Sequence, residues 1–166
     1  MGELKKSAAG FSVVGKSRDQ QFDPDKITEL LGVSPTEAHA IGDINQRHFK
    51  RTGNQRSWDF AKWQISVDRR EPGDLNSQIK EIFKLLPDSP SIWQQLHKEY
   101  SLIVFCGLWL ESFNSGERLD CETLSILSGR NLDIDLDIYQ DPDYIHDEDE
   151  DTFEFWKQVE ANNKGS

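Results

Sequence analysis

The sequence predicts a single α+β domain in which helices pack on a mixed or antiparallel sheet. Three observations predict it. The length of 166 residues suits one hydrophobic core, short apolar runs alternate with short capped helices, and one strand–helix–strand pattern occurs twice. The expected order of elements is β-α-β-β-α-α-β-α-β. We place the domain at residues 11–140, after a flexible N-terminus at 1–10 and before an acidic extension with a short C-terminal helix at 141–166.

The first strand and the first helix carry the clearest local signals. Residues 11–14 form an apolar run that ends at a glycine, which predicts a strand. In the helix that follows, Asp23 is the expected N-cap, Pro24 occupies the first helical position, and Gly32 ends the helix. The polar start of this helix is explained by capping alone.

Two further strands and a loop are expected in the next part of the chain. Residues 38–41 and 58–67 predict strands. The second strand needs a β-bulge near Ala61 and Lys62, because its large apolar residues change parity there. The basic stretch at 45–57 predicts an exposed loop inside a hairpin.

Two helices and a central strand are expected after that. Apolar residues at helical spacing predict a helix at 74–86 and a second helical piece that ends near Tyr100. Residues 102–110 are nearly all apolar, which is typical of a strand that is covered on both faces or central in its sheet.

The strand–helix–strand pattern recurs at a constant offset of 97 positions. The capping acid Asp23 matches Asp120, the terminal Gly32 matches Gly129, and apolar residues match between them without a gap. The joint recurrence of these signals predicts duplicated β-α-β units.

The string I-T-E-L-L-G-V-S-P-T that begins at Ile27, the later Gly42-Asp43 pair and the distal D-I-D-L-D-I-Y are the most specific motifs. With them the chain resembles domain-of-unknown-function family 4279 over about residues 11–140. The resemblance implies the fold class and a cytoplasmic, mostly bacterial setting. Some family members are thought to be immunity proteins that neutralise toxins. The resemblance carries no catalytic residue over to this chain.

The net charge of −11 is concentrated in one segment. Residues 131–156 hold 11 acids and no lysine or arginine, whereas the rest of the chain has equal numbers of acids and bases. General affinity for nucleic acid is therefore not expected, because phosphates require a dominant basic face. No apolar stretch reaches the roughly 18 residues of a membrane span and no secretory signal is visible, so we expect a cytoplasmic protein with no membrane partner.

The last expected strand alternates strictly between apolar and acidic residues, which places the aspartates together on its outer face. The four apolar residues of the alternation are expected to pack on the core: Leu132, Ile134, Leu136 and Ile138. One interpretation is an edge strand whose charges prevent aggregation. A second is a docking surface for a basic protein, with tyrosines as anchors. A third is weak binding of divalent cations, although the glycine of the EF-hand loop is absent. The expected partner-binding residues are Asp133, Asp135, Asp137, Tyr139, Asp141, Asp143, Tyr144, Asp147, Glu148, Asp149, Glu150 and Asp151.

No catalytic constellation is visible in the sequence. The four histidines and two cysteines lack metal-ligand spacing, and no phosphate-binding motif occurs. We therefore expect no catalytic residue, no metal site and no cofactor. The predicted function is a non-catalytic interaction module with an acidic surface, such as an immunity protein that neutralises a basic, nuclease-type toxin. The alternative is an enzyme or ligand-binding domain with a site among Trp58, Trp63, Trp109 and the loops at 45–56 and 112–118.

Overall fold

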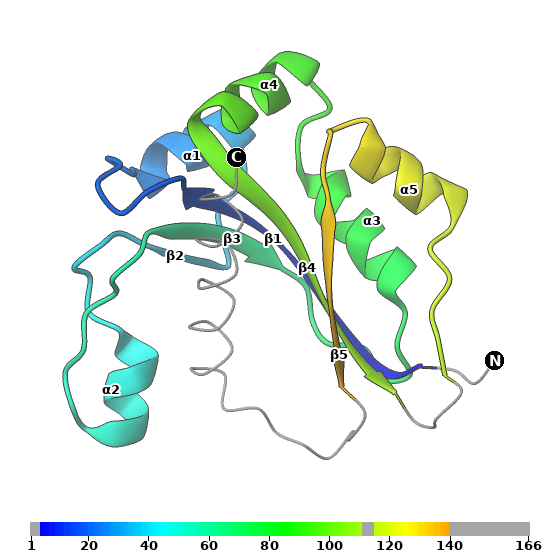
Figure 1. Ribbon diagram of the computed structural model, residues 1–166, viewed down its shortest axis with the longest axis horizontal. Coiled ribbons are helices and arrows are strands. Elements are labelled where there is room, and N and C mark those ends of the chain that lie inside the picture. Colours follow the sequence, from blue (N-terminus) through cyan, green and yellow to red (C-terminus); the bar gives the residue numbers. More distant parts are fainter. Residues whose placement is uncertain (1–3, 111–114, 140–166) are drawn as a thin grey trace.

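The computed structural model describes residues 4–110 and 115–139 (Figure 1). Strands and helices alternate along this part of the chain much as the sequence predicts. In chain order the elements are β1 (Leu4–Gly15), α1 (Pro24–Leu31), β2 (Glu37–His39), α2 (Gln46–Thr52), β3 (Lys62–Ser66), α3 (Leu75–Leu85), α4 (Pro90–Glu99), β4 (Tyr100–Leu110), α5 (Cys121–Ser128) and β5 (Ile134–Tyr139). None of these helices is long and apolar enough to cross a membrane.

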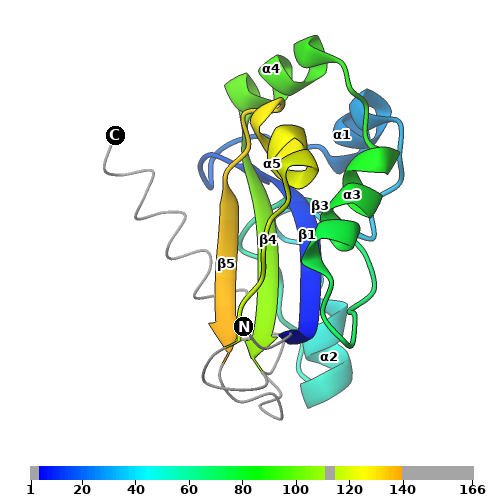
Figure 2. The ribbon, with the colours of Figure 1, turned by 90° about the vertical axis from the view of Figure 1, so that its right-hand side faces the viewer.

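The sheet has five strands in the order β2-β3-β1-β4-β5. All neighbouring strands are antiparallel except β4 and β5, which are parallel. The predicted α+β fold with a mixed sheet is therefore confirmed. Figure 2 shows that α1, α3, α4 and α5 lie on one side of the central strands. We call the opposite side of the sheet the open face.

The repeat predicted from the sequence corresponds to β1-α1-β2 and β4-α5-β5, but β3 lies between β1 and β2 whereas β4 and β5 are direct neighbours. Helix α5 begins and ends 97 positions after α1. The Asp23 carboxylate accepts a hydrogen bond from the amide of Asp25, and the Asp120 carboxylate accepts one from the amide of Thr123. The C-terminal ends of the two helices differ. Gly32, which follows α1, has a left-handed φ of 69°, whereas after α5 the residue with a positive φ is Asn131, at 54°.

Several element boundaries differ from the predicted ones. Strand β1 begins at Leu4, inside the segment that we assigned to the N-terminus. Helix α2 occupies the stretch predicted as a loop, with the Asn45 side chain as its N-cap and Gly53 at its C-terminal end. It was missed because it buries none of its residues and so shows no apolar periodicity.

The strand expected at 58–67 is shorter in the structure. Strand β3 begins only at Lys62, and Trp58 to Ala61 form an irregular approach to it. The change of parity near Ala61 is therefore the start of the strand, and the predicted bulge is wrong. Within β3 the alternation is as expected, since Trp63 and Ile65 are buried.

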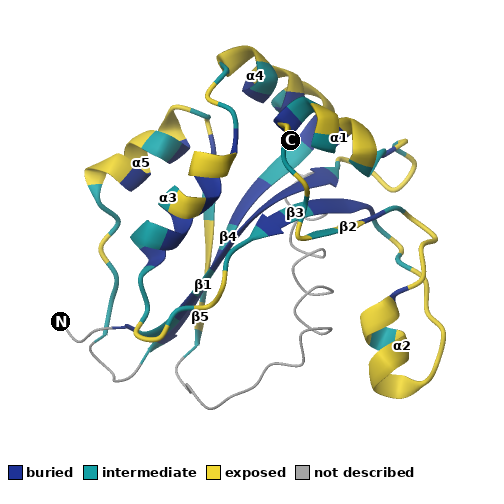
Figure 3. Ribbon diagram, turned by 180° about the vertical axis from the view of Figure 1, so that it is seen from behind, coloured by how far each residue is buried: buried dark blue, intermediate teal, exposed yellow. Residues whose placement is uncertain are grey.

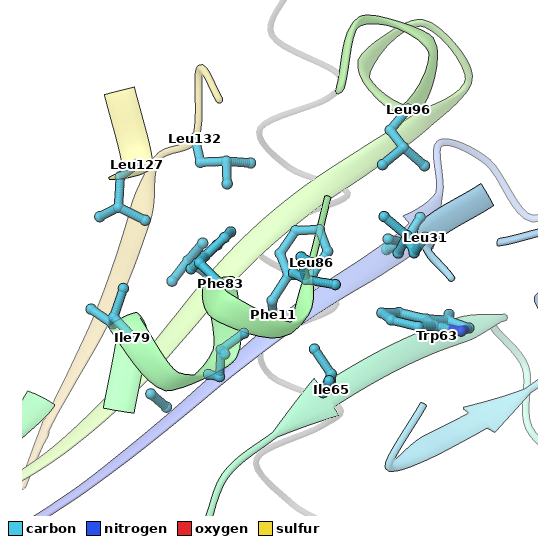
Figure 4. Close-up of a cluster of buried hydrophobic side chains, with 14 of the residues drawn as sticks. Phe11, Leu31, Trp63, Ile65, Ile79, Phe83, Leu86, Leu96, Leu127 and Leu132 are labelled. Carbon is cyan, nitrogen blue, oxygen red and sulfur yellow. The ribbon is translucent and has the colours of Figure 1, made fainter. Parts of the chain in front are cut away.

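The hydrophobic core lies between the sheet and the four helices (Figures 3 and 4). Phe11 of β1 is at its centre, and its ring lies within 6.5 Å of three other aromatic rings, measured between centroids. These rings belong to Trp63, Phe83 and Trp93. The Trp63 indole N–H is satisfied inside the core because it donates to the Thr28 hydroxyl at 3.0 Å. Burial of each large apolar side chain stabilises the fold by about 1.5–3 kcal/mol.

One polar side chain of α3 connects that helix to β1 and to the loop after β3. Gln78 of α3 is fully buried, and its amide oxygen accepts a hydrogen bond from the Ser7 hydroxyl of β1 at 2.6 Å. Its amide nitrogen donates to the carbonyl oxygen of Asp68 at 2.8 Å. Because buried polar groups must be paired, this network fixes α3 on the sheet in one register.

Candidate interaction surface

Strand register decides which side chains reach the open face. Phe11 lies opposite Ile65 of β3 and Val104 of β4, and all three side chains point into the core. Successive side chains of a strand point to opposite faces of the sheet, so the residues directly before and after these three point to the open face. On the outer strands, the same alternation places Glu37 and Asp135 on the open face. The open face therefore carries Lys6, Ala8, Gly10, Ser12, Val14, Glu37, His39, Lys62, Gln64, Ser66, Ser101, Ile103, Phe105, Gly107, Trp109, Asp135, Asp137 and Tyr139.

Strand β5 brings acidic side chains to one edge of this face. Asp135 and Asp137 alternate with apolar residues that point to the helix side, and Asp133 directly precedes the strand. Neighbouring acids on one side of a strand are about 7 Å apart. Burial raises the pKa of Asp135, and the charge of Asp133 raises it further. We call Asp133, Asp135, Asp137 and Tyr139 the acidic row.

The apolar side of β5 is only half covered. Leu132 is buried and Ile134 is partly buried, but Leu136 is 48% exposed and Ile138 is 56% exposed. The prediction that all four would pack on the core is therefore wrong for the last two. Figure 1 gives the reason: α5 lies beside the beginning of β5, and the end of the strand extends beyond that helix.

An aromatic pair ends the acidic row. The rings of Tyr139 and Trp109 stack with centroids 4.9 Å apart and an interplanar angle of 13°. The Tyr139 hydroxyl donates to the Asp137 carboxylate at 2.5 Å, and the Arg69 guanidinium lies 5.3 Å from the Trp109 ring centroid. Gly107 leaves room for this arrangement, because a Cβ there would lie 2.9 Å from the Trp109 ring. The row thus combines carboxylates with a fixed aromatic platform.

A second polar cluster lies at the opposite edge of the open face. The Lys62 ammonium is 3.0 Å from the Glu37 carboxylate, and both side chains are largely buried. The Arg47 guanidinium of α2 also reaches Glu37, at 3.3 Å. Burial tends to raise the pKa of Glu37, but the charges of Lys62 and Arg47 outweigh it and hold this pKa below its usual value. Burial also lowers the pKa of Lys62.

His39 is part of this second cluster. Its ring stacks on Trp58 with centroids 4.0 Å apart, and its Nδ1 lies 3.1 Å from the Phe60 carbonyl oxygen. Nδ1 therefore carries the proton and donates, which leaves Nε2 as an acceptor. Nε2 is buried and has no hydrogen-bond partner in the described part of the chain. Burial, together with the charge of Lys62, lowers the pKa of His39 to about 4.

One known protein family matches this chain. A family model described as a domain of unknown function (DUF4279) matches residues 4–141, which span both edges of the open face. The chain belongs to this family. The resemblance found in the sequence is thereby confirmed, and the match starts at β1 rather than at Phe11. No curated protein and no solved structure matches the chain.

Part of the predicted partner-binding set can be placed in the DUF4279 domain. The four residues of the acidic row lie together on the open face or directly before it. The remaining predicted residues lie outside the described residues: Asp141, Asp143, Tyr144, Asp147, Glu148, Asp149, Glu150 and Asp151. The Glu37–Lys62 pair was not predicted, because its members are 25 positions apart and no local pattern connects them.

The three tryptophans of the alternative predicted site have different surroundings in the described part of the chain. Trp63 lies in the core, Trp58 stacks on His39 and Trp109 stacks on Tyr139. A hollow of about 750 Å³ occurs elsewhere. It is lined by Leu4, Arg69, Arg70, Glu71, Pro72, Gly73, Asp74, Gly116, Glu117 and Arg118, so it shares only its last three residues with the predicted loop.

Metal ligands and nucleophiles are the remaining groups that could perform chemistry. Within residues 4–110 and 115–139, no three histidine, cysteine or acidic side chains are grouped so as to hold a metal ion. Cys106 is buried, and burial raises its pKa to about 12, which keeps its thiol protonated and unreactive. The open face carries carboxylates at one edge, beside the Trp109–Tyr139 stack.

Proposed function

We propose that this DUF4279 domain is a non-catalytic protein-interaction module that binds a basic protein through its acidic row. The single observation that carries the proposal is the position of the row. Asp133 lies directly before the edge strand β5, and Asp135 and Asp137 lie on it. The row ends at the Trp109–Tyr139 stack. Carboxylates steer a cationic partner toward the strand, and the partly exposed Tyr139 ring, held in place by the buried Trp109, supplies contact area that charge alone lacks.

The class of partner follows from the charge. A basic surface built to bind nucleic acid is complementary to closely spaced carboxylates. In the chain, the row continues directly into the acids of residues 141–151. The proposal is therefore an immunity protein that occupies the cationic site of a nuclease-type toxin. It acts in the bacterial cytoplasm, where such a toxin would attack nucleic acid.

Affinity capture with matched variants tests this function. The row variant carries D133N, D135N and D137N, and the control variant carries D19N, D25N and E29Q, which remove the same charge from exposed positions elsewhere. Wild type and control should retain one basic protein from a lysate of the native host, and the row variant should lose it. The captured protein should have nuclease activity that wild type inhibits. Equal capture by the row variant, or an acidic captured protein, contradicts the proposal.

A small-ligand site is the second candidate, and the hollow near Glu117 is the observation that favours it. Burial, with the negative charge of Asp74, raises the pKa of Glu117. Nearby arginines could hold an anionic ligand in this hollow. A thermal-shift screen of small carboxylates and phosphates tests this function. A stabilising compound whose effect is lost in Arg118→Ala would support it, and the absence of any stabilising compound would contradict it.

A further inference from the structure

Strand β5 forms one end of the sheet, and its outer edge has no neighbouring strand in the described part of the chain. The strand order places β4 on one side of it. Figure 2 looks toward this edge and shows α5 beside β5, with no described helix or strand in front of it. A strand in this position presents backbone N–H and C=O groups that can pair with a further strand. Over the six residues of β5 this edge is about 20 Å long.

The apolar side chains of this edge strand are exposed on the helix side of the sheet. Leu136 and Ile138 lie in register with Cys106 and Leu108 of β4, which are 0% and 5% exposed. The exposed fractions of the two β5 side chains are 48% and 56%. The apolar layer of the sheet therefore extends one strand beyond its cover. A strand added outside β5 would place its own apolar side chains beside these two residues and remove their surface from water.

Edge strands usually carry a feature that prevents pairing with other chains. Common features are a proline, a lysine or a β-bulge. The sequence of β5 is I-D-L-D-I-Y, with no proline or lysine, and its register with β4 is regular from Ile134 to Tyr139. The feature of β5 that opposes pairing is the acidic row, because like charges directly opposite one another destabilise a strand pair. Charge therefore decides which strand can be added.

The sign of the charge favours a basic strand over a second copy of this chain. In two copies paired antiparallel through β5, the acids of both rows would lie opposite each other on the same side of the sheet. Burial, and then the charge of Asp133, raise the pKa of Asp135, so a cation placed beside Asp135 would relieve an existing repulsion. A strand with lysine or arginine on one side and apolar residues on the other is complementary to both sides of β5.

We propose that β5 binds an extended segment of a basic protein as a sixth strand of the sheet. The lysine or arginine side chains of that segment lie opposite the acidic row, and its apolar side chains lie beside Leu136 and Ile138. The inference rests on the proposed function, because it states how the acidic row holds its partner. Backbone pairing supplies affinity in this mode of binding, and the alternation of side chains supplies selectivity.

A blocked peptide of about seven residues that alternates lysine and valine matches the length of β5 and serves as the probe. In fluorescence anisotropy it should bind the full chain about tenfold more tightly than a peptide of the same composition whose alternation is broken. The row variant and L136S/I138S should each weaken binding about tenfold. The controls D19N/D25N/E29Q and I41S/I44S should leave it unchanged. Ile41 and Ile44 are 45% and 43% exposed and follow β2, at the other end of the sheet.

Backbone pairing is tested with two N-methylated forms of the alternating peptide. Alternate N–H groups of an extended strand point to the same edge, so methylation of all lysine nitrogens or of all valine nitrogens removes the donors of one edge. One form should bind about tenfold more weakly and the other should bind like the unmodified peptide. The form that fails gives the direction of the added strand. In the protein, alternate amides of β5 should exchange about tenfold more slowly when the peptide is bound.

The outcomes separate strand pairing from the proposed function. Equal binding of both N-methylated forms and the unmodified peptide, with the acidic row still required, would overturn strand pairing and leave the acidic row as a docking surface. Unchanged binding to L136S/I138S, or equal binding of the peptide with broken alternation, would also contradict the inference. Absence of binding by the alternating peptide would contradict it as well, and the capture experiment would then decide the proposed function by itself.

Discussion

The substitution Gly107→Ala tests how the aromatic platform of the acidic row is built. A Cβ at position 107 would lie 2.9 Å and 3.0 Å from two atoms of the Trp109 ring, and 3.8 Å from the Cβ of Ala8. Carbon atoms of neighbouring groups prefer about 3.5–4.0 Å. The Trp109 ring must therefore move by several tenths of an ångström, which separates it from Tyr139.

The size of the effect follows from three terms. Overpacking costs about 1–3 kcal/mol, and loss of an aromatic stack costs about 0.5–1.5 kcal/mol. Replacement of glycine by alanine in a strand returns about 0.5–1 kcal/mol of backbone entropy. We expect Gly107→Ala to lower the free energy of unfolding by about 2 kcal/mol. In a Trp109→Val background the ring is gone, so the same change should be neutral or slightly stabilising.

Urea denaturation of the four proteins in this cycle gives the required free energies, and near-ultraviolet circular dichroism reports the Trp109–Tyr139 stack. A coupling free energy of about 2 kcal/mol between positions 107 and 109 is expected. The reasoning fails if Gly107→Ala costs the same in both backgrounds. It also fails if the stack signal survives the substitution unchanged.

Three further predictions concern the framework of the site. Gln78→Leu leaves the Asp68 carbonyl without its partner and the Ser7 hydroxyl without its acceptor, so it should cost about 2 kcal/mol in urea denaturation. Ser7→Ala should not recover this loss, because the Ser7 hydroxyl also accepts a hydrogen bond from the Asp74 amide. The folded pKa of His39 is about 4, below its ordinary 6.5, so the unfolded chain binds this proton first. Stability should fall as the pH drops from about 6.5 to about 4, by up to about 3 kcal/mol from this group. His39→Phe, which keeps a ring on Trp58, should flatten that part of the profile; an unchanged profile refutes the assignment. Asn45→Ala removes the N-cap of α2 and should cost that helix about 1 kcal/mol, seen as roughly fivefold faster amide exchange at 46–52 and not elsewhere.

Local signals predicted the elements that their own residues determine. Helix α1 was predictable because Asp23, Pro24 and Gly32 each act within one turn of the chain. The matching positions of α5 follow from the 97-residue offset. Helix α2 had similar capping signals in Asn45 and Gly53, but none of its residues is buried, so the periodicity that usually reveals a helix is absent.

The candidate site was predicted only in part, because long-range packing decides it. Alternation along β5 correctly placed Asp135 and Asp137 on one side. It gave no information about where α5 ends, so the exposure of Leu136 and Ile138 was missed. The contact of Trp109 with Tyr139 depends on the parallel pairing of β4 with β5, which no pattern within either strand specifies.

The most direct test of the central claim is the rate at which the captured basic protein binds the row variant. At low salt, D133N/D135N/D137N should slow association about tenfold and should reduce its dependence on ionic strength, while the control D19N/D25N/E29Q should behave as wild type. This result would place the partner on the acidic row. Association of the row variant within twofold of wild type, with the same dependence on salt, would contradict the proposed function.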